Sequence, residues 1–365
     1  MLLDGKKYAE SKISELRERV SKLHKVPTLA IIQVAGDRAS DTYVQNKLKR
    51  CLEVGIEPKL CYFLPNVSEE RVADKIRELN MDKDVTGILL QLPLPEHLDE
   101  YYLTNLIDPK KDVDGFTETN AGKLALGQQD LVPCTAKGVI DLLDFYNIEL
   151  EGKDVLIINR SNIVGKPLAQ LFLQRNSTVT IAHSKTEHLK DKVKQADIVV
   201  TGVGIPNFLR YDDFSEGTTI VDISINFVEG RMCGDVKKTS YGYLSTVGNL
   251  TPVPGGIGQT TVIALLENVV QIAEFDDFVL KYFPRPGKSH DINSDYFVID
   301  GTDCPLMPLK YETNVISSTS ESSTKITGDN IDLNVSGAST KTTRNDTVNA
   351  LSEAFFTYVD GDFKK

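Results

Sequence analysis

The sequence predicts a two-domain α/β protein with parallel sheets covered by helices and an irregular C-terminal tail. Two successive series of apolar strands and amphipathic helices predict this class, and a change to Ser-, Thr- and Asn-rich sequence marks the tail. A chain of 365 residues has the usual length of two domains. We expect a first domain over residues 1–147, completed by a helix near 262–283, a second domain over 148–261, and a largely disordered extension over 284–365.

Composition argues against several classes of partner. The net charge of −11, from 41 basic and 52 acidic residues, does not favour a nucleic-acid or membrane-surface binder. No apolar run approaches membrane-spanning length, and the first residues read as an amphipathic helix rather than a signal peptide. The five cysteines are odd in number and lack CxxC spacing, which favours free thiols. We therefore expect a cytoplasmic protein.

The first series combines helical periodicity with clear start and stop signals. Ser40 or Asp41 is expected to cap the second helix, and Gly55 to end it. The predicted helices are Asp4–His24, Ser40–Gly55, Ser68–Asn80, Leu98–Leu106 and Thr135–Asn147. The predicted strands are Thr28–Val34, Lys59–Leu64 and Thr86–Leu92.

The second series begins after Lys153 and repeats the alternation. Its predicted strands are Asp154–Ile158, Thr178–Ala182, Asp197–Val203, Thr218–Ile223 and a segment near Gly242–Thr246. Its predicted helices are Lys166–Arg175, Glu187–Gln195 and Thr260–Phe275.

The segment Leu250–Leu266, LTPVPGGIGQTTVIALL, joins the last strand to the last helix. Its prolines fix φ, and its glycines permit positive φ or the close approach of a ligand. Such a loop presents backbone N–H groups at the start of a helix. A tight structural turn is the alternative interpretation.

Four polar residues of the first series are candidates for a site. Tyr43 and Lys47 share one helix face at i,i+4 spacing, although a helical lysine is more often a solvated charge. Gln91 ends an apolar strand, where open parallel sheets bind ligands. Asp114 lies in the loop DVDGF and has paired acceptors for a heterocycle, although Asp before Gly is also ordinary turn chemistry.

The second series has the layout of a dinucleotide-binding unit. The loop after its first strand runs from Asn159 to Gly165 with one glycine, so it matches the usual three-glycine fingerprint weakly. The next strand ends in His183-Ser184-Lys185 instead of the acidic residue typical of NAD sites. With Arg160 nearby, this pattern favours NADP over NAD.

Six motifs occur in order along residues 1–283, and together they resemble the FolD family of bifunctional methylenetetrahydrofolate dehydrogenases and methenyltetrahydrofolate cyclohydrolases. The motifs are Tyr43-x-x-x-Lys47, Gln91-Leu-Pro-Leu-Pro, Asp112-Val-Asp114-Gly, Pro133-Cys-Thr135, Arg160-Ser-Asn-Ile-Val-Gly-Lys-Pro167 and Thr251-Pro-Val-Pro-Gly-Gly256. Each motif is weak alone, but the ordered set is specific.

The resemblance implies an N-terminal catalytic domain, a Rossmann-type NADP domain, a folate cleft between them and a homodimer formed through the cofactor domain. It implies oxidation of 5,10-methylenetetrahydrofolate with NADP⁺, then hydrolysis to 10-formyltetrahydrofolate, a reaction sequence of one-carbon metabolism and purine biosynthesis. The substrate cation is itself the electrophile, so no metal is expected.

The resemblance also assigns residues. Lys47 matches the lysine that assists water addition, and Gln91 the residue that orients it; Tyr43 matches a folate contact, and Asp114 the pterin anchor. Further folate contacts implied are Leu92, Pro254 and Gly255. The implied cofactor contacts are Thr135, Asn159, Arg160, Ser161, Ile163, Ser184, Ile225, Ile257 and Thr261.

The chain departs from the family pattern at Asn159, Ala136 and Ser224, and in the last motif at Gln259 and Thr260, where GPMT becomes GQTT. The missing proline is expected to loosen alignment near the pterin. Three alternatives stay open: a dehydrogenase-only relative, another two-domain NADP dehydrogenase such as a shikimate-type enzyme, and a non-catalytic folate or nucleotide binder.

Overall fold

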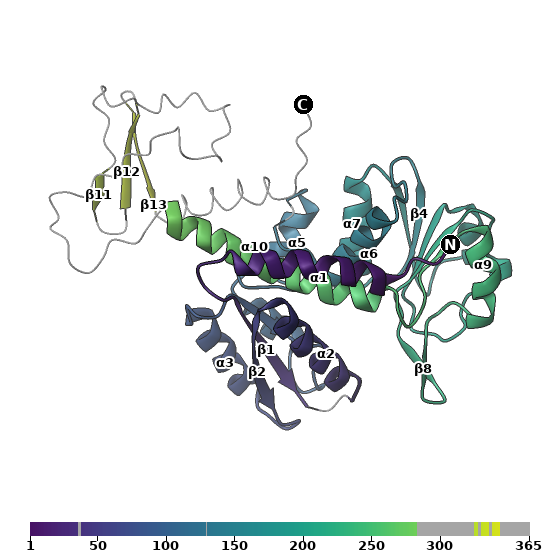
Figure 1. The fold of residues 1–365 in the computed structure, drawn as a ribbon, viewed down its shortest axis with the longest axis horizontal. Helices are drawn as coiled ribbons and strands as arrows, with labels where there is room; N and C mark the ends of the chain where they lie inside the picture. Colours follow the sequence, from purple (N-terminus) through teal and green to yellow (C-terminus); the bar gives the residue numbers. More distant parts are fainter. Residues whose placement is uncertain (36–37, 129, 283–324, 328–329, 336–337, 344–365) are drawn as a thin grey trace. The chain divides into compact units, whose positions relative to one another are not determined.

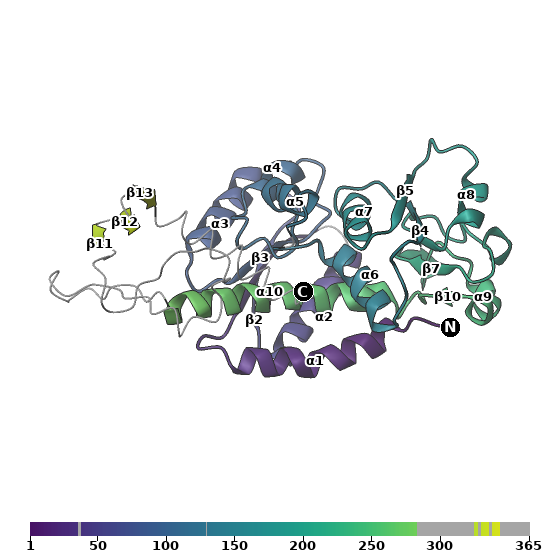
Figure 2. The same cartoon turned by 90° about the horizontal axis from the view of Figure 1, so that it is seen from above.

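The computed structural model describes residues 1–35, 38–128 and 130–282, together with the backbone of 325–327, 330–335 and 338–343. Residues 1–127 and 131–273 form one compact unit, which contains two parallel sheets and the helices around them (Figures 1 and 2). This architecture confirms the predicted α/β class.

A second unit comprises residues 128–130 and 274–365. Its described strands form an antiparallel sheet of β11 (Lys325–Thr327), β12 (Asn330–Val335) and β13 (Ala338–Thr343). Most of the segment 284–365 lies outside the described residues, so the disorder expected of it stays a prediction.

The first sheet is parallel; its strands at 28–34 and 87–90 are buried on both faces, whereas its edge strand at 57–63 is mostly exposed. Its order is β2 (Glu57–Phe63), β1 (Thr28–Val34) and β3 (Gly87–Leu90). Alternate residues of β1 enter different cores: Leu29 and Ile31 join one apolar cluster, and Ala30 and Ile32 join another. Burial on both faces explains why the strand reads as a continuous apolar run rather than an alternating one.

The helices of this part agree closely with expectation. They are α1 (Gly5–Ser21), α2 (Arg38–Val54), α3 (Glu69–Met81), α4 (Glu100–Asn105), α5 (Glu118–Ala125) and α6 (Cys134–Phe145). Gly55 ends α2 with φ of 90°, as predicted, whereas the helix begins two residues before Ser40. Helix α5 was not predicted, and Thr117 caps it by accepting a hydrogen bond from the backbone N–H of Asn120.

The second sheet has the order expected of a dinucleotide-binding unit. Its strands are, in order, β10 (Asn249–Leu250), β7 (Thr219–Asp222), β6 (Ile198–Thr201), β4 (Asp154–Ile158) and β5 (Thr178–Ala182). The helices of this part are α7 (Gly165–Gln174), α8 (Leu189–Gln195) and α9 (Tyr241–Val247), with short 3₁₀ turns at Tyr211–Asp213 and Lys238–Ser240. Because the chain goes from β4 to one side for β5 and to the other for β6, the carboxyl ends of β4 and β6 border a topological switch point.

Two features of the second part differ from the sequence-based expectation. The strand predicted near Gly242–Thr246 is wrong, because these residues belong to α9. Leu244 is buried and Tyr243 is exposed, so burial in the tertiary structure decides the conformation over the strand propensity of Tyr, Thr and Val. The hairpin of β8 (Asn226–Val228) and β9 (Arg231–Cys233) was not predicted.

Helix α10 (Ile257–Tyr282) begins three residues earlier than predicted and joins the cores of the two sheets. Its residues Ile263, Leu266 and Val269 belong to the same apolar cluster as residues of α1, α2, α6 and β4. Figures 1 and 2 both show α1 running beside α10. The chain start also reaches the second sheet, since Leu2 pairs in parallel with Leu250 of β10.

Candidate functional site

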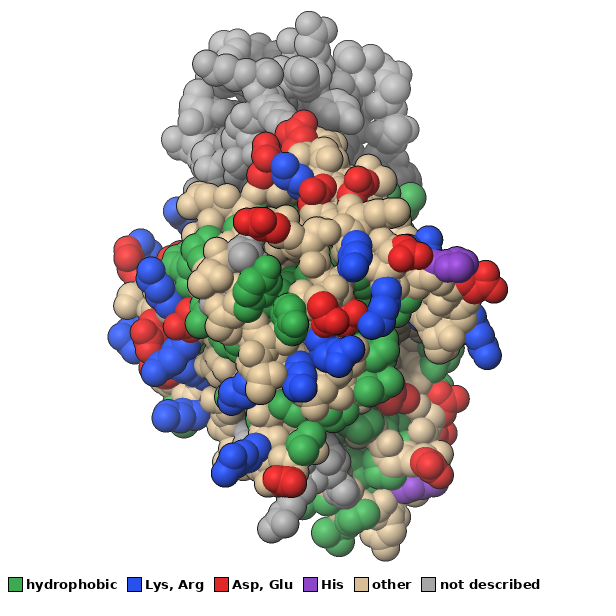
Figure 3. Space-filling view, turned by 90° about the vertical axis from the view of Figure 1, so that its right-hand side faces the viewer, with side chains coloured by type: hydrophobic (Ala, Val, Ile, Leu, Met, Phe, Trp, Pro, Cys, Tyr) green, Lys and Arg blue, Asp and Glu red, His purple; other side chains and the backbone are tan. Residues whose placement is uncertain are grey.

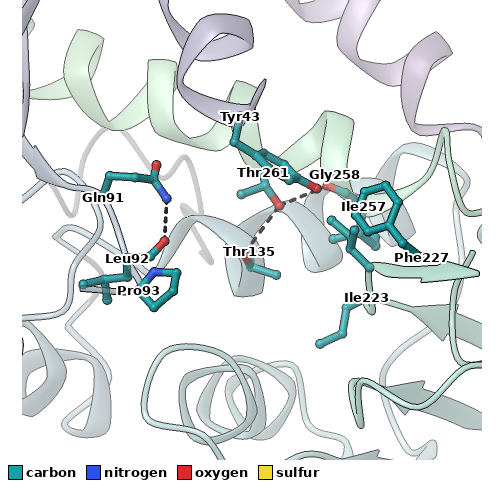
Figure 4. Close-up of a pocket in the computed structure, with 11 residues that line it drawn as sticks. Tyr43, Gln91, Leu92, Pro93, Thr135, Ile223, Phe227, Ile257, Gly258 and Thr261 are labelled. Carbon is teal, nitrogen blue, oxygen red and sulfur yellow. Dashed lines mark hydrogen bonds between the residues drawn. The ribbon is translucent and has the colours of Figure 1, made fainter. Parts of the chain in front are cut away.

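A pocket of about 420 Å³ lies within the first unit, between the first sheet and the carboxyl end of the second (Figure 4). Its walls come from α2, the end of β3, the start of α6, the segment after β7, the hairpin strand β8 and the start of α10. The lining residues are Tyr43, Gln91, Leu92, Pro93, Thr135, Ile223, Ile225, Phe227, Ile257, Gly258 and Thr261. The pocket is thus mainly apolar, with a few hydroxyl and amide groups, as is usual for a site that binds a flat organic ligand.

An oriented lysine–amide pair borders this pocket. The Nζ of Lys47 donates to Oε1 of Gln91 at 3.0 Å, and Nε2 of Gln91 donates to the backbone oxygen of Leu92 at 2.6 Å. The second bond fixes which end of the amide faces the lysine, so Gln91 presents an acceptor. Tyr43 lies one turn before Lys47 on α2 and lines the pocket, and burial raises the pKa of its phenol. The phenol is therefore a hydrogen-bond donor at neutral pH.

Asp114 lies in the loop after Val113 and is half-buried. Burial raises the pKa of its carboxyl, the nearby positive charge of Lys47 lowers it, and Asp112 raises it further. Gly115 has φ of 65°, and a Cβ there would lie 2.6 Å from the backbone oxygen of Leu131. Only glycine permits this close turn. The loop that carries Asp114 therefore packs closely against the segment that leads into α6.

The loop before α10 is held by the start of the chain. The backbone N–H of Gly5 donates to the oxygen of Gly255 at 2.8 Å, and a Cβ on Gly5 would lie 2.1 Å from the oxygen of Gly256. The backbone N–H of Gln259 donates to Gly256 at 3.0 Å, a bond that a proline at this position would lack. The loop therefore keeps a regular helix start despite the departure from GPMT.

The hydroxyls of α10 complete the pocket wall. Thr261 Oγ1 lies 3.5 Å from Oγ1 of Thr135 and 3.0 Å from the backbone oxygen of Ile257 (Figure 4). Thr260 is buried and packs against Gly138 of α6. A Cβ on residue 138 would lie 2.6 Å from Oγ1 of Thr260. The close packing of α10 on α6 thus places Thr135 and Thr261 side by side.

Asn159 and Gly202 lie across from each other at the switch point. Asn159 Nδ2 donates to the oxygen of Gly202 at 2.6 Å, and its Oδ1 accepts from both the N–H and the Oγ of Ser161 at 2.8 Å. Ser161 Oγ accepts in turn from the backbone N–H groups of Val164 and Gly165 at 3.1 and 3.4 Å. Asn159 has no positive φ, so its side chain is accommodated without backbone strain. These bonds order the loop at the start of α7.

The charges at this end of the sheet fit a phosphorylated dinucleotide. Arg160 and Lys185 are exposed, and within the described part of the chain neither side chain forms an ion pair. Ile158 pairs with Ala182, so Arg160 and Ser184 follow neighbouring strands at the same edge. Two unpaired cations beside a helix N-terminus are suited to hold phosphates of NADP.

The structure brings most of the sequence-predicted residues to one region. Tyr43, Gln91, Leu92, Thr135, Ile225, Ile257 and Thr261 line the pocket directly. Lys47 borders the pocket through Gln91, whereas Asp114, Pro254 and Gly255 are not among its lining residues. The predicted contacts Asn159, Arg160, Ser161, Ile163 and Ser184 lie on the loops after β4 and β5, also outside the pocket lining.

Sequence reasoning missed four lining residues: Pro93, Ile223, Phe227 and Gly258. Ile223 follows β7, so the rule that ligands bind at the carboxyl ends of parallel strands points to it. Phe227 lies on the unpredicted hairpin, and no sequence pattern identified it. In the described part of the chain, no group of three or more His, Cys, Asp or Glu side chains is arranged to hold a metal ion.

Comparison with known protein families gives two successive matches. Residues 3–114 match the tetrahydrofolate dehydrogenase/cyclohydrolase catalytic domain, and residues 133–277 match the NAD(P)-binding domain of the same enzymes. The chain belongs to the tetrahydrofolate dehydrogenase/cyclohydrolase family. Its site therefore combines the catalytic and cofactor-binding parts of this family in one chain.

Similar members of the family are bifunctional. "Bifunctional protein FolD" of Bacillus cytotoxicus is 44% identical over 285 residues, which cover 77% of this chain and 99% of the relative. The bifunctional FolD structure from Campylobacter jejuni has a TM-score of 0.73 and 41% identity, covering 75% of this chain and 98% of that one. The FolD structure from Trypanosoma brucei, complexed with NADP cofactor and inhibitor, has a TM-score of 0.72 and 31% identity, covering 76% and 98%.

The tight contact between Gly165 and Asn159 leads to a prediction about cofactor binding. A Cβ at position 165 would lie 2.4 Å from the backbone oxygen of Asn159, so Gly165→Ala has to displace the loop at the start of α7. We expect NADP⁺ binding, measured by calorimetry, to weaken by about tenfold or more, with hydrolysis of the methenyl substrate unchanged. Gly122→Ala is the matched control, because no atom lies within 4 Å of a Cβ there. Unaltered NADP⁺ affinity in Gly165→Ala would contradict this expectation.

Proposed function

We propose that the pocket oxidises 5,10-methylenetetrahydrofolate to the 5,10-methenyl cation with NADP⁺ and then hydrolyses that cation to 10-formyltetrahydrofolate. Membership in the family, with both of its domains matched, supports this function. The single observation that carries the second activity is the Lys47–Gln91 hydrogen bond at the pocket wall. A pocket built only for the dehydrogenase has no evident need of an oriented amine.

We assign the folate subsite to the end of the pocket formed by the first sheet. Tyr43, Gln91 and Leu92 line it, and the Tyr43 phenol is a donor for a polar group of the substrate. Asp114 is proposed to anchor the pterin through its carboxylate, with Lys47 providing the compensating positive charge. Pro254 and Gly255 are proposed to border the substrate from the loop before α10.

Lys47 is proposed to transfer protons during hydrolysis. Water adds to the methenyl carbon and loses a proton, and the bond from that carbon to one nitrogen breaks as the nitrogen gains a proton. The amine is aimed by Gln91, whose own amide is fixed by Leu92. The cationic carbon of the substrate supplies the electrophile, so the protein's part is positioning and proton transfer.

The cofactor subsite is proposed to follow the carboxyl end of the second sheet. NADP⁺, when bound, accepts a hydride from the methylene carbon of the substrate. Arg160 and Ser184 are proposed to hold its 2′-phosphate, and Ser161 and Ile163 lie on the loop that would face the pyrophosphate. The remaining proposed contacts are Thr135, Asn159, Ile225, Ile257 and Thr261. All of these except Asn159 line the pocket, and this supports a nicotinamide position next to the folate.

Removing the Lys47 amine tests the assigned hydrolytic role. Lys47→Met keeps an unbranched side chain that is one atom shorter and removes the Nζ that donates a hydrogen bond to Gln91. We expect cyclohydrolase kcat to fall by about 100-fold or more, in line with the loss of an acid–base group, while methylenetetrahydrofolate oxidation persists. The absorbance of the methenyl compound reports both steps.

The control for this experiment is Lys49→Met, which removes an exposed lysine from the same helix. It is expected to hydrolyse the methenyl substrate at the wild-type rate. Wild-type hydrolysis by Lys47→Met would show that the role assigned to this lysine is wrong.

A homodimer formed through the cofactor-binding part is a further proposal. Exposed apolar side chains support it, among them Val228 on the β8 hairpin and Ile181 on the edge strand β5. Figure 3 shows hydrophobic side chains at the surface between charged ones. Buried contact of such side chains is typical of homodimer interfaces.

Sedimentation measures this assembly. We expect the wild type to sediment as a dimer and Val228→Asp to shift toward the monomer, because the new carboxylate would be desolvated in the interface. Leu126→Asp, which alters an exposed leucine of the first part, is the control and should stay dimeric. A monomeric wild type would contradict the proposal.

The extension over residues 284–365 is predicted to be dispensable for catalysis. The family matches end at residue 277, and the described pocket residues all precede 262. A chain that ends after residue 283 should therefore retain kcat and KM for both reactions within about twofold, measured beside the full chain. Loss of activity on truncation would assign the extension a part in the site.

We also propose that the enzyme acts in the cytoplasm and that its 10-formyl product supports purine biosynthesis. The described cysteines Cys51, Cys61, Cys134 and Cys233 are all free, which suits a reducing compartment. Among the described helices, none is long and apolar enough to cross a membrane.

A further inference from the structure

Asn268 is a buried amide on α10 with both of its N–H donors aimed at neighbouring loops. Its Nδ2 donates to the backbone oxygen of Val113 at 2.8 Å and to that of Val132 at 3.0 Å. The side chain is 1% exposed, so these bonds replace contacts with water that the amide would otherwise make. An amide nitrogen carries two protons, and this geometry uses both.

The two carbonyls belong to the loops that carry site residues. The carbonyl of Val113 is part of the peptide unit that begins Asp114, and that of Val132 is two residues before the first turn of α6, which carries Thr135. Cys134 adds a second tie, because its thiol donates to Val113 at 3.3 Å. The amide of Asn268 thus bridges two chain segments that are adjacent in space and distant in sequence.

Helix α10 contacts the pocket and this bridge with the same face. Ile257 and Thr261 line the pocket, and Asn268 follows Thr261 by seven residues, or two helical turns, which is about 10 Å along the helix axis. A helix is stiff over this length. The distance between the hydroxyl of Thr261 and the loop of Asp114 is therefore set by α10 itself.

We propose that Asn268 is a positioning residue that holds Asp114 at a set distance from the Thr135–Thr261 wall, and so aligns the pterin with the rest of the pocket. This inference rests on the proposed function of Asp114 as the pterin anchor. Asn268 does not line the pocket, so it acts through the two loops rather than by touching the substrate.

A merely structural role is the competing explanation, since any buried amide that loses its partners destabilises a protein. The two explanations differ in what they change. A structural role lowers stability and leaves KM of the folded enzyme unaltered. A positioning role raises KM for both folate substrates, which share Asp114.

Asn268→Asp is the sharpest variant, because the carboxylate has the same shape but no donor and faces two carbonyl oxygens. We expect KM for methylene- and methenyltetrahydrofolate to rise by about tenfold at neutral pH, as for the loss of buried hydrogen bonds that position a binding group. The rise should shrink as the pH is lowered, because the protonated carboxyl regains one O–H donor.

Asn80→Asp is the matched control. Asn80 Nδ2 donates to the oxygen of Leu106 at 2.7 Å, and its Oδ1 accepts from the N–H of Asp108 at 2.9 Å, so the same change removes one half-buried amide donor away from the pocket. This variant is expected to lose stability while KM for the folate substrates stays at the wild-type value at every pH.

Asn268→Ala provides a second test without a buried charge. It should show the same rise in folate KM, with no recovery at low pH. Wild-type folate KM in the folded Asn268→Ala or Asn268→Asp enzyme would overturn the positioning role. A wild-type chain without either activity would instead overturn the proposed function, so the two failures are distinguishable.

Discussion

The close packing of α10 against the start of the chain and against α6 is the constraint on which the pocket depends. Gly5 meets Gly256 and Gly138 meets Thr260 at distances where a Cβ would overlap another atom. Glycine at each contact lets two backbones approach closely. The apolar face of α10 then fills the core shared by both sheets, and its first turn brings Ile257 and Thr261 to the pocket.

The pocket lies where residues that follow strands of both sheets meet. Gln91 follows β3 of the first sheet, and Ile223 follows β7 of the second. Parallel strands direct their carboxyl ends to one edge, and loops at this edge are free to carry ligand-binding groups without disturbing the sheet. Lys47 of α2 is held at this edge by the hydrogen bond that it donates to Gln91. The amide of Gln91 therefore serves both substrate contact and lysine orientation.

The departures from the family pattern are absorbed by new hydrogen bonds. Asn159 bridges to Gly202 and holds Ser161, and the hydroxyl of Ser224 donates to Asp235 at 2.7 Å while accepting from the N–H of Gly204 at 3.2 Å. Asp235 also accepts from Val203 and Thr201. The side chains of Asn159 and Ser224 therefore tie neighbouring strand ends together on the cofactor side of the site.

The sequence by itself determined the fold class, most helices and strands of residues 1–282, and the family. Periodicity, caps and strand-end residues are local signals, and the ordered motifs from Tyr43 to Gly256 are specific as a set. Only the tertiary structure decided that residues 241–247 are helical and that Phe227 enters the pocket wall. Each of these depends on contacts between residues far apart in the chain, where burial and hydrogen-bond geometry override local propensity. The same reason explains Asn268, because nothing in its local sequence indicates that its two N–H groups join the loops of Asp114 and Thr135.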